Sequence, residues 1–210
     1  MEMQEKLLRR GLGELNQANR EFLRGNLRLT HNHASLASDC LSDQRLEMQE
    51  RKVEAALIQG RSARMMANLE VAENALRRAR RLSWRGIDPV DCLHPAIELE
   101  LLQLEEARGQ FTQACHDYQA LKRKLRPWPD LRLVAETRAL ACAVKTSDFD
   151  SAKRLNSGLE LVLPGFNIRE ECGARRWQAI YGIRRGDFPF AEERLEDAGR
   201  VADNLGAPLE

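Results

Sequence analysis

Apolar residues recur every three to four positions along most of the chain, which is the period of an amphipathic helix. The longest stripes cover residues 5–24, 44–66 and 190–205. Long Val/Ile runs and period-two alternation, which would indicate strands, are missing from the sequence, and aromatic residues make up only 5% of it. The pattern therefore predicts an all-α fold.

Five similar breaks interrupt these helical stripes, and the best formed lies at residues 185–198. There Gly186 permits the positive φ that ends a helix, Asp187 can cap the next one, and Pro189 fits its first turn. Weaker copies predict further bends near residues 25, 67, 109 and 147. A small residue follows each bend, at positions 30, 72, 114, 152 and 191, so the spacings are 42, 42, 38 and 39 residues.

Self-similarity at this period predicts a stack of helical hairpins in which each hairpin buries its apolar face against its neighbours. We expect one domain over residues 1–210. Its repeat units are predicted at about residues 5–40, 43–85, 89–126, 130–163 and 168–205.

The recurring pattern Gly-Asp/Asn-Phe-x-x-Ala, with a large residue four positions later and a small or apolar one seven positions later, resembles the tetratricopeptide repeat. Ala191, Leu195 and Ala198 carry it in the last unit. The spacing is longer than the usual period of about 34 residues, and this longer period is similar to that of repeats in bacterial transcription activators of the maltose-regulator type. The resemblance implies a right-handed superhelical array of about five antiparallel helix hairpins.

Composition limits the function classes. The chain has 33 Lys and Arg against 32 Asp and Glu, a net charge of +1, so no overall field favours nucleic acid or an anionic membrane. Five scattered cysteines without a C-x-x-C pair argue against a disulfide framework or zinc knuckle. The first residues lack the apolar core of a signal peptide. We expect a cytoplasmic, bacterial protein without a membrane segment, and a piece of a larger multidomain protein is an open alternative.

No residue cluster predicts catalysis. The sequence has no Ser/His/Asp order, Cys/His dyad, H-E-x-x-H motif or phosphate loop. His31 and His33 are two residues apart, so their side chains would not face each other on a helix. We therefore expect no enzyme activity, no cofactor and no metal site.

Two basic clusters end the second helices of their units, each beside a tryptophan. The candidate docking residues are Arg77, Arg81, Arg85, Lys122 and Arg126. Cations there also favour the negative end of the helix dipole. A solvated, dipole-matched surface and an electrostatic docking surface are both open interpretations.

The first helices of such an array normally line its inner groove. Counting back from each bend gives the groove candidates Leu57, Arg61, Arg64, Leu99, Gln103, Glu106, Thr137, Ala141, Val144, Arg176, Ile180 and Ile183. Their mixed polarity suits an extended peptide or a partner helix. We expect a non-enzymatic protein-interaction or regulatory scaffold, with this groove more important than the basic clusters. The alternatives are a small-ligand sensor of a bacterial transcription or signalling regulator and, less favoured, a nucleic-acid-binding repeat.

Overall fold

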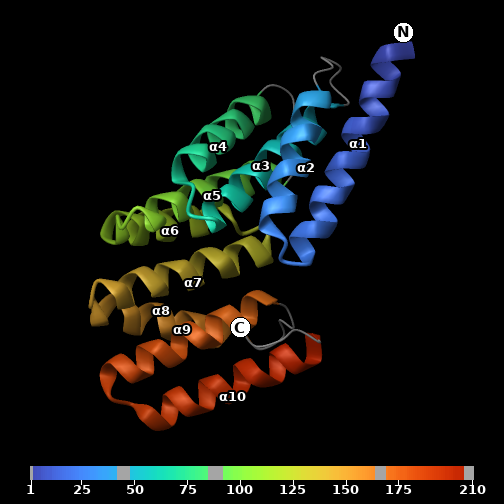
Figure 1. The fold of residues 1–210 in the computed structure, drawn as a ribbon. Helices are drawn as coiled ribbons and strands as arrows, with labels where there is room; N and C mark the ends of the chain where they lie inside the picture. The colour runs from blue at the N-terminus through green and yellow to red at the C-terminus, as the bar shows by residue number, and fades with distance from the viewer. Residues whose placement is uncertain (1, 42–47, 85–91, 164–168, 206–210) are drawn as a thin grey trace. The chain divides into compact units, whose positions relative to one another are not determined.

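The structure, a computed structural model, describes residues 2–41, 48–84, 92–163 and 169–205 (Figure 1). Ten α-helices and no strand occur in this part of the chain, which confirms the predicted all-α class. The helices are α1 (Glu2–Leu23), α2 (Leu27–Cys40), α3 (Gln49–Met65), α4 (Leu69–Ser83), α5 (Leu93–Ala107), α6 (Phe111–Lys124), α7 (Pro129–Lys145), α8 (Phe149–Val162), α9 (Arg169–Arg185) and α10 (Phe188–Leu205). None of these helices is both long enough and apolar enough to cross a bilayer.

The helices form two compact units. The first unit is Met1–Arg108 and contains α1 to α5, and the second unit is Gly109–Glu210 and contains α6 to α10. In the first unit, α1 packs on α2, α2 on α3, α3 on α4 and α4 on α5. In the second unit, α6 packs on α7, α7 on both α8 and α9, and α9 on α10. Consecutive helices thus pair within each unit, as the hairpin interpretation predicts.

The five predicted bends all contain a residue in the left-handed backbone conformation. These residues are Gly25, Ala67, Gly109, Ser147 and Gly186, with φ between 58° and 84°. At the last bend the Gly186 amide donates to the carbonyl of Ile183 and the Asp187 amide to that of Gly182. This is the hydrogen-bond pair that closes a helix with a left-handed residue. The bends at residues 25, 67 and 147 have the same pair.

Three polar residues after these bends start the following helices. The side chains of Asn68, Asp148 and Asp187 accept a hydrogen bond from the backbone amide three residues later. The capping role predicted for Asp187 is therefore confirmed. Asp130, which follows the Pro-Trp-Pro break, looks like a cap in the sequence but lies in the first turn of α7, because the helix already begins at Pro129. The helix stops predicted at residues 86–89, 164–165 and 206–208 lie outside the described residues.

The small residues that follow the bends are all buried. Thr30, Ala72, Ala114, Ala152 and Ala191 are each at most 3% exposed. A residue without a long side chain is required where two helices approach closely. The repeat alignment thus places the correct residues inside the packed helices.

Gly60, in the middle of α3, is required by the same close packing. A Cβ atom at Gly60 would lie 2.6 Å from Cγ of Leu76, which is fully buried in α4. We expect Gly60→Ala to lower the free energy of unfolding by roughly 1–3 kcal/mol, because overpacking outweighs the gain in helix propensity. The matched control is Gly13→Ala in α1, where a Cβ would meet open space. That variant should instead gain up to about 1 kcal/mol.

Urea unfolding followed by circular dichroism measures both glycine variants. Opposite shifts of the unfolding midpoint are expected. A stabilised Gly60→Ala variant would show that α3 and α4 do not approach at this residue.

Candidate functional site

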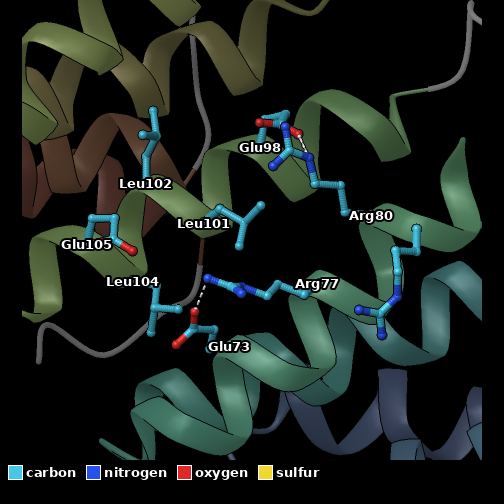
Figure 2. Close-up of a pocket in the computed structure, with 9 residues that line it drawn as sticks. Glu73, Arg77, Arg80, Glu98, Leu101, Leu102, Leu104 and Glu105 are labelled. Carbon is cyan, nitrogen blue, oxygen red and sulfur yellow. Dashed lines mark ion pairs between the residues drawn. The ribbon is translucent and has the colours of Figure 1, made fainter.

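An open cleft lies between α4 and α5 in the first unit. Its volume is about 480 Å³, a size in the range of pockets that accept ligands. Six of its nine lining residues are charged and three are leucines. The lining residues are Glu73, Arg77, Arg80, Arg81, Glu98, Leu101, Leu102, Leu104 and Glu105 (Figure 2). We call this site the α4–α5 cleft.

Ion pairs flank the apolar part of the α4–α5 cleft. Within α4, Nη2 of Arg77 lies 2.5 Å from Oε1 of Glu73. Between the two helices, Nε of Arg80 lies 2.8 Å from Oε1 of Glu98. Figure 2 shows Leu101 between these two pairs. A bound side chain would therefore meet apolar surface in the middle of the cleft and charged groups on either side.

Glu73 binds two arginines at once. Arg77 contacts its Oε1, while Arg108 contacts its Oε2 and also pairs with Glu105 at 3.0 Å. The hydrogen bond from Arg108 is the main cause that holds the pKa of Glu73 below its ordinary value. The Arg77 side chain is 65% exposed, compared with 30% for Arg108. Arg77 can thus exchange Glu73 for another carboxylate while Arg108 still neutralises Glu73.

Arg81 has no such partner. Its exposed side chain lines the cleft, and among the described residues no ion pair or hydrogen bond engages it. Arg77 and Arg81 are four residues apart on α4, so they lie on the same helix face. With Arg108 included, four arginines at this site are matched by three glutamates. The α4–α5 cleft therefore has one cation in excess.

The structure separates the predicted docking residues. Arg77 and Arg81 lie in the α4–α5 cleft of the first unit, whereas Lys122 and Arg126 belong to the second unit. Nζ of Lys122 lies 3.0 Å from Oε1 of Glu136, a buried residue of α7. Lys122 thus contributes to the packing of α6 on α7, and Arg126 is exposed after α6. The fifth predicted residue, Arg85, lies outside the described residues.

Most of the predicted groove residues present little surface. The candidates that are at most 7% exposed are Leu57, Leu99, Gln103, Glu106, Thr137, Ala141 and Val144. On α9, Arg176 is exposed, Ile180 is half-buried and Ile183 is 49% exposed. The α9 residues are therefore the groove candidates that a partner could contact most directly.

Arg61 and Arg64, also groove candidates, are bound to a buried carboxylate. Glu100 of α5 is 3% exposed, and its oxygens lie 2.7 Å from Nε of Arg61 and 2.9 Å from Nη2 of Arg64 on α3. Burial by itself would raise the pKa of Glu100, but the charges and hydrogen bonds of the two arginines outweigh it and lower that pKa. These arginines thus join α3 to α5. Sequence reasoning missed Glu100, although its position in the apolar run 99–102 was a usable signal.

A second buried charge network joins three helices of the second unit. Arg175 of α9 lies 3.4 Å from Glu171, 3.6 Å from Glu160 of α8 and 3.7 Å from Asp197 of α10. Arg194 of α10 contacts the same Glu160 and Asp197, at 3.4 and 2.9 Å. Because these groups bind one another across α8, α9 and α10, we interpret the network as part of the packing.

One trio of residues has the composition of a nucleophilic site but not its geometry. Oγ of Ser83 lies 3.2 Å from Nδ1 of His94, and Nε2 of His94 lies 4.0 Å from Glu98. The Ser83 hydroxyl, however, donates to the carbonyl oxygen of Arg80 at 2.8 Å. His94 must then donate to Ser83, which is the reverse of the proton transfer that activates a serine. In the described part of the chain, no group of three or more His, Cys, Asp or Glu residues is arranged to hold a metal ion.

Comparison with known proteins adds no relative to this picture. No protein-family model matches the sequence, and no curated protein or solved structure matches it.

Proposed function

We propose that the chain is a non-enzymatic interaction module of stacked helical hairpins that binds a protein or peptide partner. The observation that carries this proposal is the set of five bends, each with a left-handed residue, spaced by 42, 42, 38 and 39 residues. Arrays of such hairpins expose long continuous surfaces, which suit extended or helical segments of a partner. The resemblance to tetratricopeptide repeats supports the same class and a right-handed superhelical arrangement.

The α4–α5 cleft is the site that best fits a protein partner. Its leucines offer apolar contact, and its ion pairs offer exchangeable hydrogen bonds to polar side chains. Nucleic acid is disfavoured because Glu73, Glu98 and Glu105 alternate with the arginines and would repel successive phosphates. A small-ligand sensor is the second candidate, favoured by the cleft volume of about 480 Å³. The charged lining argues against it, since small-ligand pockets are predominantly apolar.

Burial changes the expected balance between the two predicted surfaces. The groove prediction included Arg61, but Arg61→Glu would place a second carboxylate beside buried Glu100 and test folding instead of binding. Exposed α9 residues, in the variant Arg176→Glu/Ile183→Asp, give a cleaner test of the groove. We now expect the α4–α5 cleft to contribute more to binding than the groove does.

Affinity purification of the intact chain from its native cell tests the proposed class of partner. We expect a protein to co-purify in a fixed ratio, as measured by mass spectrometry, and to dissociate less readily from the Arg176→Glu/Ile183→Asp variant than from a variant of the cleft. Native mass spectrometry of the same sample detects a bound small molecule, and absorbance at nucleic-acid wavelengths detects RNA or DNA. A small molecule or nucleic acid as the sole ligand would overturn the proposal.

A further inference from the structure

We infer that the α4–α5 cleft binds an acidic side chain of the partner, held by Arg77 and Arg81 and flanked by a large apolar residue that contacts Leu101. This inference rests on the proposed function and specifies the chemistry of the bound segment. It follows from three features of the cleft: its excess cation, the redundant partner of Arg77, and the apolar surface between the ion pairs.

The charge balance of the cleft favours a single carboxylate. Arg81 carries a charge that no described residue neutralises, and Arg77 lies one helical turn before it. If Arg77 turns from Glu73 to a ligand, Arg108 continues to pair with Glu73. One incoming carboxylate can therefore bind both arginines at the cost of one redundant contact. Two charge-assisted hydrogen bonds on a carboxylate are stronger and more specific than one.

The apolar surface distinguishes a peptide from a free anion. Leu101 and Leu102 are only partly buried and line the cleft beside the charged groups. Figure 2 shows the Leu101 side chain directed between the Arg77–Glu73 and Arg80–Glu98 pairs. An inorganic anion would leave this surface in water, whereas a leucine or phenylalanine next to an aspartate or glutamate would cover it. The preferred ligand is thus an acidic residue with an adjacent large apolar residue.

The glutamates of the cleft set its selectivity. Glu98 and Glu105 lie on α5, across the cleft from the arginines of α4. A ligand with closely spaced negative charges would approach these carboxylates as well as the arginines. The cleft should accordingly prefer one carboxylate flanked by apolar residues over a polyanion such as an oligonucleotide.

Selection from a random peptide library against the intact chain tests the inference. We expect enriched sequences to contain Asp or Glu beside Leu, Ile or Phe. The strongest peptide is then synthesised with a fluorophore and its Kd is measured by anisotropy. In the variant Arg77→Gln/Arg81→Gln we expect the Kd to rise by about tenfold or more. Binding should also weaken as ionic strength rises, because exposed charges are screened.

Two further variants separate binding from folding. Arg123→Gln/Lys124→Gln removes two exposed cations from the last turn of α6 in the second unit and should leave the Kd unchanged. Glu73→Gln releases Arg77 and should tighten binding severalfold, a gain that a damaged fold would not produce. Circular dichroism melts of each variant verify that the helices remain folded.

The outcomes of the selection distinguish this inference from the proposed function. Enriched peptides that bind the Arg77→Gln/Arg81→Gln variant unchanged would overturn the cleft assignment and leave a peptide-binding module elsewhere on the chain. Enriched peptides without acidic residues would overturn it too, as would stronger competition by an oligonucleotide than by the peptide. Failure to enrich any peptide would overturn the inference if a protein co-purifies from the native cell, and would overturn both proposals if none does.

Discussion

Replacing Glu100 by glutamine is expected to lower the free energy of unfolding by about 3 kcal/mol or more, because it leaves two buried or half-buried arginines without their counter-ion. Glu100 is 3% exposed and is the only carboxylate that the structure pairs with Arg61 and Arg64 in the part of the chain that it describes. Urea unfolding at neutral pH, followed by circular dichroism, measures the change. A loss below 1 kcal/mol would show that water already solvates this site.

The pH dependence of stability gives a second readout of Glu100. Its pKa in the folded chain lies below the ordinary value of 4.5. The carboxylate therefore contributes stability that is present above pH 4.5 and is lost as the pH falls through the folded-state pKa. The difference between the wild type and Glu100→Gln should accordingly shrink as the pH is lowered below that value. A difference that stays constant would indicate that the glutamine disturbs packing instead of charge.

Glu171→Gln is the matched control, because Glu171 is also a buried glutamate paired with arginine. Here burial raises the pKa above its ordinary value, and the charge of Arg175 only partly offsets it. A raised pKa means that this group stabilises the folded chain below its unfolded-state pKa and that this contribution is lost as the pH rises through the folded-state pKa. Arg175 also retains Glu160 and Asp197 in the variant. We therefore expect Glu171→Gln to cost little at neutral pH or to stabilise the chain.

The bends were predictable from sequence because their chemistry is local. Gly25, Gly109 and Gly186 are residues that accept a left-handed conformation without strain, and Asn or Asp follows two of them. Ala67 and Ser147 give no such local signal. Their bends were predicted from the spacing and from the small residue five positions later. Repetition along the chain thus supplied what the individual residues did not.

The groove prediction was limited by the way α7 is buried. Helical periodicity identifies an inner face only when the opposite face is polar and exposed. In α7 every residue from Ala139 to Val144 is buried, together with Glu136 and Thr137. No single stripe on this helix marks a groove, so counting back from the bend selected packing residues such as Ala141. The exposed candidates on α9 are the exception.

The α4–α5 cleft was beyond sequence reasoning for a different reason. The two basic clusters were evident, but nothing in the sequence distinguishes Arg81 from Arg77 or Arg80. The difference arises only when α5 packs on α4 and places Glu98 beside Arg80. Arg108, which follows α5, then reaches back to Glu73 across the two helices. Which arginine stays available is therefore a property of the packing and not of the local sequence.

Replacing Ala191 by leucine is expected to be the most damaging change in the α9–α10 hairpin, lowering the free energy of unfolding by roughly 1–3 kcal/mol. Ala191 is 3% exposed, and a Cβ atom built at Gly182 of α9 would lie 3.2 Å from its own Cβ. The two helix backbones are thus too close for three additional carbon atoms. Either the leucine adopts a strained rotamer or the helices move apart.

Glu192→Leu is the matched control for this substitution, since Glu192 is the next residue of α10 and is exposed. It introduces the same side chain with the same helix propensity, so its thermal midpoint should change little. Ala114→Leu and Ala152→Leu occupy the corresponding buried positions of their hairpins and should lower the midpoint as Ala191→Leu does. Thermal melts followed by circular dichroism compare all four variants. If the three alanine variants melted with the wild type and the control, the small residues after the bends would not be the points at which the paired helices meet, and the repeat alignment would lose its physical basis.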